Sequence, residues 1–325
     1  QRMSKNSPAP PARSLTVAIV QATTESSAEQ HLDKTAQLIE QAAREGARLV
    51  VFGETWLGGY PAWLDHCREV ALWGHEATKE AYADYRRRSI TVPGDETERL
   101  GRLAADLGVV LVIGASERVD AGPGNGTLYN TLLTFDASGE LINHHRKLVP
   151  TYTERLVWGP GDGHGLRALP TAAGRVGGLV CWEHFMPLAR QKLHRDGEEV
   201  HVAVWPTVVE MHQVASRHYA FEGRCFVLAA GQLMHEDDIP AGLSIAEGRT
   251  DDGLLLRGGS AVIAPDGSYL AGPTFDQEQI LMAELDFGLI DQEAMTLDVS
   301  GHYQRPDLFD FECHPGPPRR PDPTG

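Results

Sequence analysis

Short apolar runs alternate with amphipathic stretches along most of the chain. Residues 15–21 (LTVAIVQ) and 48–52 (RLVVF) are apolar and rich in β-branched side chains, which favours buried strands. Between them, residues 28–45 repeat apolar side chains at helical spacing, and Gly46 follows where a helix would end. A strand, a helix and a strand in this order predict a crossover connection between neighbouring parallel strands.

The same alternation continues to residue 294. Turn sequences at 137–139 (ASG) and 265–267 (PDG) predict two hairpins, so the sheet content is mixed rather than wholly parallel. Two layers of sheet inside two layers of helix would bury this many strands in one α/β domain. The remaining predicted strands are 109–116, 128–135, 140–145, 176–180, 200–205, 225–231, 258–264, 269–271 and 280–286, and the remaining helices are 96–107, 188–195, 212–224 and 287–294.

Both ends of the chain differ from its middle. Residues 1–14 are polar and proline-rich, without the apolar segment of a signal peptide, and are predicted to be a disordered arm. No linker divides residues 15–290, which we expect to form one domain. Residues 291–325 become proline-rich and are predicted to be an extended tail, a possible contact between subunits.

The composition excludes some classes of partner. The formal net charge is −16, whereas nucleic acids and anionic membrane surfaces are bound by basic patches. The apolar runs are shorter than the ~18–20 residues of a membrane span. The cysteines (Cys67, Cys181, Cys225 and Cys313) form no C-x-x-C pair, which favours free thiols in a reducing, cytoplasmic setting.

The chemistry of the chain is indicated by three polar groups at the ends of predicted strands. Glu54 follows the strand 48–52, Lys147 follows the strand 140–145, and Cys181 follows the apolar run 176–180. Active sites of α/β proteins are built where strands give way to loops. Each group alone has a structural explanation (a helix cap, a surface charge, a buried thiol), but together they predict a site.

These residue types suit nucleophilic catalysis. Pro187 begins a predicted helix after Cys181, and a helix N-terminus favours the thiolate. A carboxylate can accept the thiol proton, and an ammonium can stabilise a tetrahedral intermediate, with a backbone N–H after the cysteine as second donor. Glu154, seven residues after Lys147, could hold that lysine in place.

Several neighbours have open interpretations. Residues 55–85 are rich in aromatic side chains and begin as a loop, so Trp56 and Tyr60 could line a pocket or pack a core. His184 could form a Cys–His dyad, but Glu54 already supplies a base, so a pocket-shaping or orienting role is favoured. Adjacent histidines at 144–145 point to opposite faces of a strand, so they do not indicate a metal site.

Three separated motifs resemble the nitrilase (carbon–nitrogen hydrolase) superfamily, and its nitrilase branch most of all. They are residues 52–61 (FGETWLGGYP), 145–155 (HRKLVPTYTER) and 181–184 (CWEH), in that order. Residues 257–267 (RGGSAVIAPDG) and 301–307 (GHYQRPD) also look like that branch. The resemblance covers roughly residues 15–308. One departure is Gly53, where the family often has proline.

The resemblance implies a four-layer α-β-β-α sandwich with two mixed sheets and no metal or organic cofactor. It implies that Glu54 is the general base, Lys147 the oxyanion-stabilising group and Cys181 the nucleophile, with Glu154 as a fourth member. The Trp182 backbone N–H would be the second oxyanion donor. The expected reaction converts a small organic nitrile into a carboxylic acid and ammonia, and homo-oligomers are expected, often dimers extended into spirals.

Three other functions are weighed against this one. An amidase or carbamoylase would use the same triad, although Cys-Trp-Glu looks more like nitrile hydrolysers. A non-catalytic binding or assembly protein could have kept the fold, but the presence of all three polar groups argues against it. A redox protein using Cys181 with Cys225 is weakly supported, because no resolving cysteine is close in sequence.

Overall fold

The fold is that of a computed structural model, which describes residues 13–246 and 252–316. Residues 1–12 of the predicted arm lie outside the described residues. The first strand, β1, begins at Ser14, so the last residue assigned to the arm is already part of a sheet.

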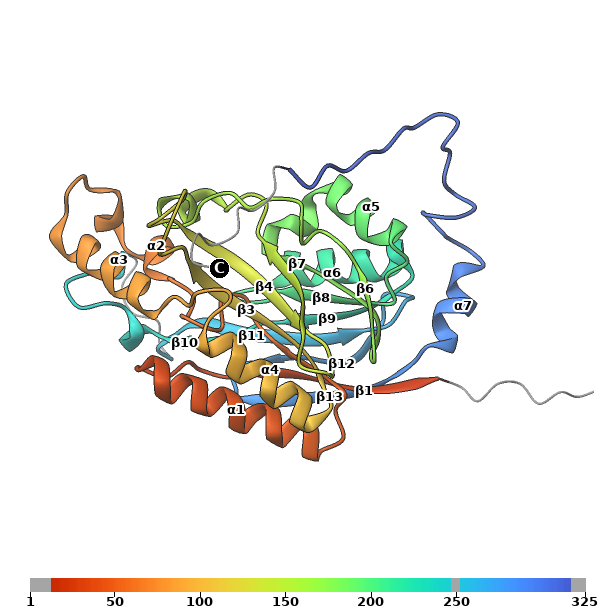
Figure 1. The fold of residues 1–325 in the computed structure, drawn as a ribbon, viewed down its shortest axis with the longest axis horizontal. Helices are drawn as coiled ribbons and strands as arrows, with labels where there is room; N and C mark the ends of the chain where they lie inside the picture. The colour runs from red at the N-terminus through yellow and green to blue at the C-terminus, as the bar shows by residue number, and fades with distance from the viewer. Residues whose placement is uncertain (1–12, 247–251, 317–325) are drawn as a thin grey trace, which may run out of the picture.

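The first sheet contains the crossover predicted at the start of the chain. Its strand order is β13-β1-β2-β3-β4-β5, with β1, β2 and β3 parallel and the other neighbours antiparallel. Helices α1 (Ala28–Arg44) and α4 (Asp95–Leu107) cover its outer face (Figure 1). The strands are β1 (Ser14–Gln21), β2 (Leu49–Phe52), β3 (Val110–Arg118), β4 (Leu128–Phe135), β5 (Leu141–Arg146) and β13 (Gln279–Asp286).

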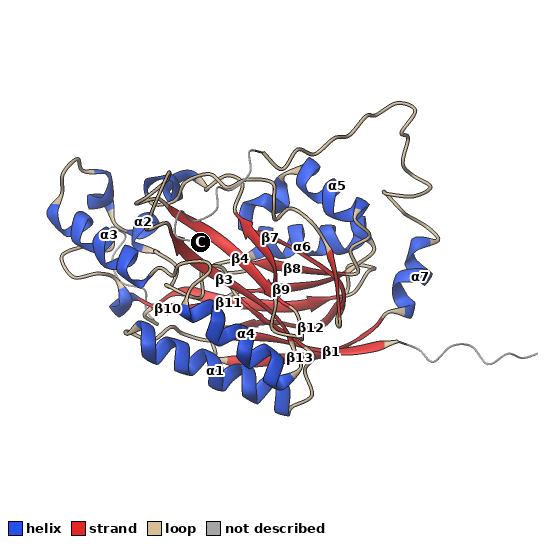
Figure 2. Cartoon of the chain, viewed as in Figure 1, coloured by secondary structure: helices blue, strands red, loops and turns tan. Residues whose placement is uncertain are grey.

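The second sheet has the order β10-β11-β9-β8-β7-β6, with β12 also paired to β11. Strands β7, β8 and β9 are parallel. Helices α5 (Pro187–Arg195) and α6 (Glu210–Gly223) lie on its outer side (Figure 2). The strands are β6 (Leu169–Thr171), β7 (Gly174–Val180), β8 (Val200–Val204), β9 (Phe226–Ala230), β10 (Leu233–His235), β11 (Leu254–Ile263) and β12 (Tyr269–Phe275).

The four-layer sandwich predicted from the sequence is confirmed, and the alternation of side chains along β1 explains it. Val17 and Ile19 belong to the core between the two sheets, where residues of β7, β8 and β9 also pack. Ala18 and Val20 point the other way and pack beneath α1 and α4. A strand that is buried on both faces needs an unbroken apolar run, which is what residues 17–20 supply.

Some elements differ from the predictions. Helix α3 (Glu76–Arg88) and the short helix α2 (Trp63–His66) occupy the aromatic-rich region, and β6 and β10 were not expected. After α7 (Gly288–Ala294), the chain leaves the body of the fold and passes over α5, where the backbone oxygen of Phe311 accepts a hydrogen bond from Arg195 (Figure 1). No helix of the described residues is long and apolar enough to cross a membrane.

Candidate active site

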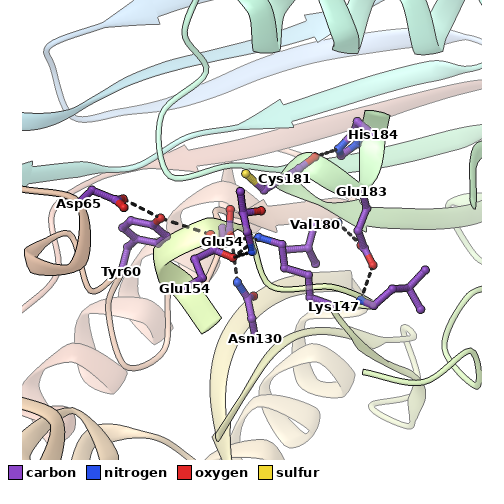
Figure 3. Close-up of polar contacts among 12 residues, drawn as sticks. Glu54, Tyr60, Asp65, Asn130, Lys147, Glu154, Val180, Cys181, Glu183 and His184 are labelled. Carbon is purple, nitrogen blue, oxygen red and sulfur yellow. Dashed lines mark hydrogen bonds and ion pairs between the residues drawn. The ribbon is translucent and has the colours of Figure 1, made fainter. Parts of the chain in front are cut away.

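The three predicted polar groups meet between the two sheets. Glu54 lies just past the end of β2, Lys147 directly follows β5, and Cys181 directly follows β7. Lys147 Nζ lies 3.2 Å from Glu54 Oε1 and 2.7 Å from Glu154 Oε2. The Cys181 sulfur and an oxygen from each of the two carboxylates lie within 4.8 Å of one another. Figure 3 shows the four side chains converging.

Each carboxylate of this cluster has its own support. Asn130 Nδ2 donates a 2.7 Å hydrogen bond to Glu54 Oε1, and the Thr151 amide donates one of 2.7 Å to Glu154 Oε2. The Tyr60 hydroxyl lies 3.3 Å from Glu154 Oε1. Glu54 Oε2 has no partner among the described residues, so one oxygen of this buried carboxylate remains available to a proton or a ligand.

The backbone around Glu54 is held without the proline that the family often has before it. Gln232 Nε2 donates a 2.6 Å hydrogen bond to the Glu54 carbonyl. The Leu57 amide donates one of 3.0 Å to the carbonyl of Gly114 in the adjacent strand β3. Gly53 therefore does not leave the segment loose.

Glu183 joins the segment of the cysteine to the segment of the lysine. Its carboxylate accepts 2.7 Å hydrogen bonds from the amides of Val180 and Leu148, which adjoin Cys181 and Lys147 in sequence. His145 Nε2 lies 3.0 Å from both of its oxygens. Burial opposes ionisation of Glu183, but His145 and the two amides lower its pKa overall, so it stays charged. Neither Glu183, although it lies in the motif 181–184, nor Asn130 was assigned a role from the sequence.

Cys181 begins a short 3₁₀-helix (Cys181–Phe185) and has a left-handed backbone, with φ of 51°. Such a conformation costs a non-glycine residue about 1–3 kcal/mol and tends to occur at functional sites. The Trp182 backbone N–H lies beside the sulfur and acts to lower the pKa of the thiol. The sharp turn therefore presents the thiol beside a main-chain donor.

The local electrostatics favour a neutral thiol. Burial and the Glu54 carboxylate raise the pKa of Cys181 well above its usual range, and Lys147 and the Trp182 N–H offset this only in part. Desolvation therefore outweighs the groups that favour the thiolate in the resting site. The thiol needs a base before it can attack.

Glu54 has a pKa that suits this task. Burial raises the pKa of Glu54 to about 7, although Lys147 and Asn130 act in the opposite direction. Burial would lower the pKa of Lys147, but Glu54, the thiol and Glu154 raise it overall, so Lys147 remains an ammonium. A base poised near neutral pH thus lies beside a fixed positive charge.

The donor set Glu54, Glu154 and Cys181 could in principle hold a metal ion. Lys147 Nζ, however, hydrogen-bonds to both carboxylates and already neutralises part of their charge. A buried ammonium in that position competes with any cation, so these residues fit an ion poorly.

A cleft of about 780 Å³ opens onto Cys181. Tyr60 and Glu154 are among its polar lining residues, and Trp182, Met186, Val209 and Leu256 are among its apolar ones. Trp182 is 54% exposed and lines the cleft, so this residue contributes its indole to the wall as well as its backbone N–H beside the thiol. The cleft can accommodate a small, largely apolar molecule next to the thiol.

Two predicted pocket residues lie elsewhere. Trp56 is fully buried beneath α1, donates a 2.9 Å hydrogen bond to Thr35 and packs on Phe52, so it belongs to the core. His184 is buried behind the cysteine, and its Nδ1 lies 2.6 Å from the Cys181 carbonyl oxygen (Figure 3). Among the predicted pocket residues, Tyr60 and Trp182 line the cleft and Trp56 and His184 do not.

Fold and site together define a four-layer α/β protein with a buried Glu-Lys-Cys cluster at the base of a cleft. The chain belongs to the carbon–nitrogen hydrolase family, whose sequence profile matches residues 16–294. A solved carbon–nitrogen hydrolase from Helicobacter pylori G27 superposes with a TM-score of 0.68 over 91% of this chain and 97% of that one. The two sequences are 22% identical, so this likeness concerns the fold alone.

Relatives of higher identity are named as nitrilases. The chain is 41% identical to an aliphatic nitrilase of Sinorhizobium fredii, over 86% of this chain and 88% of that protein. It is 38% identical to a bifunctional nitrilase/nitrile hydratase of Lupinus angustifolius, over 88% of this chain and 82% of that protein. Both likenesses include the segments that carry the Glu-Lys-Cys cluster, because each spans most of the chain.

Proposed function

We propose that the protein is a nitrilase that hydrolyses a small organic nitrile to the carboxylic acid and ammonia. The observation that carries this proposal is the Glu54-Lys147-Cys181 cluster at the base of the cleft, in a chain about 40% identical to proteins named nitrilases. Glu54 acts as general base, Cys181 as nucleophile and Lys147 as oxyanion-stabilising group, with Glu154 holding Lys147.

The reaction begins when Glu54 takes the thiol proton and the sulfur attacks the nitrile carbon. The C–S bond forms, the C≡N bond loses one π bond, and Glu54 passes the thiol proton to the nitrogen, which gives a thioimidate and leaves Glu54 ionised again. Water, deprotonated by Glu54, adds to the same carbon to give a tetrahedral intermediate. Cleavage of its C–N bond releases ammonia and leaves an acyl-thioester, which a second water hydrolyses to the acid and the free thiol.

Lys147 and the Trp182 N–H stabilise the charge that develops in these steps. Lys147 is fixed by two carboxylates and the Trp182 amide lies beside the sulfur, so little reorganisation is needed during the reaction. If the C–S bond of the tetrahedral intermediate breaks first, the product is the amide. The acid-to-amide ratio therefore reports which bond breaks.

A panel of aliphatic, arylaliphatic and aromatic nitriles, each paired with its amide, tests the proposal. We expect the enzyme to release ammonia and acid from at least one nitrile, and the Cys181→Ala variant to release none. The arylaliphatic arm tests whether the apolar wall of Trp182, Met186 and Val209 accepts a ring. Turnover of amides alone would establish the amidase alternative, and equal activity of parent and Cys181→Ala would establish a non-catalytic role.

The redox alternative has little support. Cys181 and Cys225 are both free and buried. Burial also raises the pKa of the Cys225 thiol well above its usual range, which makes it unreactive.

We also propose that the protein is a cytoplasmic homo-oligomer. The free thiols support the reducing location, including the exposed Cys313. Helix α6 presents an exposed apolar stripe of Met211, Val214 and Phe221 at helical spacing, away from the sheet. This stripe is suited to packing against a second copy of the chain, and the C-terminal tail is a further candidate contact.

A further inference from the structure

A chain of buried polar groups runs from the back of the nucleophile into the helical layer. His184 Nδ1 lies 2.6 Å from the Cys181 carbonyl oxygen, and His184 Nε2 lies 2.9 Å from His201 Nε2. His201 Nδ1 in turn lies 2.7 Å from Glu198 Oε1. Figure 3 shows the first of these contacts, with the sulfur of Cys181 turned away from His184.

The surrounding residues are shaped to hold these groups. The ring of His201 stacks on Tyr219 with centroids 3.6 Å apart, and His184 stacks on Trp205 at 4.6 Å. A Cβ atom on Gly177 of β7 would lie 2.2 Å from Glu198 Oε1, so the strand has no side chain where the carboxyl group lies. Glu198, His201 and His184 are each at most 5% exposed.

Glu198 has no lysine or arginine partner among the described residues. Its second oxygen accepts a 2.6 Å hydrogen bond from the Tyr219 hydroxyl, and within the described residues no lysine or arginine bonds to it. Arg190 donates to the His184 carbonyl, not to its ring. The titratable groups that face Glu198, His201 or His184 come from several elements. They are His194 and Asp196 from α5 and its C-cap, Tyr219 and His212 from α6, Glu183 from the 3₁₀-helix, and the Cys225 thiol before β9.

The contacts fix where the protons lie. The Cys181 carbonyl can only accept, so His184 carries its proton on Nδ1, and a neutral His184 then accepts at Nε2. His201 must therefore donate from Nε2. The remaining contact, between His201 Nδ1 and Glu198 Oε1, contains one proton: either Glu198 is a neutral acid that donates it, or His201 is an imidazolium.

Loss of that proton cannot be confined to Glu198. An ionised Glu198 would face the lone pair of a neutral His201, unless His201 moved its proton to Nδ1. Two bare Nε2 atoms would then face each other, unless His184 also changed tautomer, which would leave a bare Nδ1 against the Cys181 carbonyl. Three contacts with two protons must contain one repulsive pair.

We propose that Glu198, His201 and His184 form a positioning relay that holds the strained backbone of Cys181, and that the relay is intact only while it keeps this shared proton. The carbonyl is the point of action, because rotation of the Cys181–Trp182 peptide would turn the Trp182 N–H away from the thiol. The inference rests on the proposed function only in taking Cys181 as the nucleophile.

The titration of the two groups supports this arrangement. Burial raises the pKa of Glu198 to about 8, although the Tyr219 hydroxyl acts against this. Burial also lowers the pKa of His201 well below its usual range, so the proton resides on Glu198 at neutral pH. The pKa of Lys147 is raised, so loss of the lysine proton does not cause the alkaline decline that the relay predicts.

Glu198→Gln tests the relay, because the amide keeps both hydrogen bonds but cannot ionise. Its N–H donates to His201 and its oxygen accepts from Tyr219. We expect kcat of the parent to fall about tenfold per pH unit above its alkaline midpoint, whereas Glu198→Gln loses about twofold or less up to about pH 9.5. Glu199→Gln, a change in the neighbouring carboxylate that pairs with Arg13, is the matched control and should keep the parental profile.

Tyr219→Phe is the second variant, and it covers the case in which Glu198→Gln does not fold. It removes one hydroxyl that stabilises ionised Glu198 and does not touch the cleft. The alkaline midpoint should rise by about half to one pH unit, with KM unchanged. A packing role alone would change stability without moving this midpoint.

The rates are measured as ammonia release from phenylacetonitrile, butyronitrile and their amides. Absence of nitrile turnover in the parent would count against the proposed function. Identical pH profiles of kcat for parent, Glu198→Gln and Tyr219→Phe on either substrate class would overturn the relay.

Nitrogen-15 NMR of histidine-labelled enzyme tests the relay without substrate. The Nδ1–H signal, assigned with His184→Asn, should change above about pH 8 in the parent but persist in Glu198→Gln, and a signal insensitive to pH in the parent would overturn the proposal.

Discussion

At the scale of single residues, the site depends on charges that are buried together. Lys147 and Glu54 have fully buried side chains, and Glu154 is almost as enclosed. Removing one partner of such a group leaves an uncompensated charge, which costs far more than a surface ion pair contributes. The cluster must therefore be treated as a unit, and Glu54 is the member whose protonation changes near neutral pH.

The acid side of the pH profile should belong to Glu54. Burial raises the pKa of Glu54 to about 7, and the base must be ionised to act. We therefore expect kcat/KM to increase as the pH rises through about 7 and to be low at more acidic pH. Glu54→Gln cannot accept the thiol proton, so we expect kcat/KM to drop about 10²–10⁴-fold and the acid limb to disappear. Steady-state rates of both proteins across pH check this, and a near-normal rate with an unchanged limb would refute the assignment.

At the scale of elements, the site depends on how closely the loop after β2 approaches strand β3. A Cβ atom at Gly114 would lie 2.3 Å from the Gly53 carbonyl oxygen and 2.5 Å from the Thr55 amide nitrogen. A Cβ atom at Gly53 would meet nothing closer than 3.5 Å. The fold therefore requires a glycine at position 114, where the backbones meet, but leaves room for a side chain at position 53.

Gly114→Ala should push the Glu54 segment out of place. Overpacking of this kind costs about 1–3 kcal/mol, and a shift near 1 Å at a catalytic group can lower the rate about 10²-fold. Gly53→Ala is the matched control and should keep stability and rate near those of the parent. Urea unfolding and kcat measure both effects; comparable losses in the two variants would show that the close approach is not what matters.

The same scale separates what the sequence could predict from what it could not. The double-faced strands, the crossover helices and the three strand-end groups follow from local patterns, as β1 and Cys181 illustrate. Helix α3 was not predicted because the aromatic residues of its stretch suggested a pocket wall or the packing of a loop. Strand β6 was not predicted because it has only three residues, one of them a proline. Asn130 contacts Glu54 and Glu183 contacts Leu148, both distant in sequence, and no local pattern records such contacts. A polar residue inside an apolar strand was nevertheless a signal for Asn130.

At the scale of the whole molecule, the exposed apolar stripe on α6 is unusual for a protein with so acidic a surface. Val214 is 50% exposed and lies between Met211 and Phe221, which are 59% and 47% exposed. The opposite side of the helix packs through Tyr219 and Ala220 against the core. One face of the helix is thus committed to the fold and the other is available to a partner.

Val214→Glu should weaken the proposed self-association. Burying a charge in an apolar interface is unfavourable, so the particle mass measured by light scattering should fall. Activity per subunit of parent and variant can be compared at equal protein concentration. Ala83→Glu on the exposed side of α3 is the control and should keep the parental mass. A mass that is unchanged in Val214→Glu would place the contact elsewhere, for instance on the C-terminal tail.

The half-exposed indole of Trp182 has an optical consequence. Trp182 lies in the cleft wall directly after the nucleophile, and its ring meets the ring of Phe185 edge-on with centroids 5.6 Å apart. Trp56 and Trp205, in contrast, are fully buried in the interior. Occupation of the cleft displaces water from this one ring and leaves the interior indoles unchanged. The chain therefore carries its own fluorophore at the reacting centre, and acylation and release of Cys181 could be followed in real time as a rise and fall of intrinsic emission, without a label.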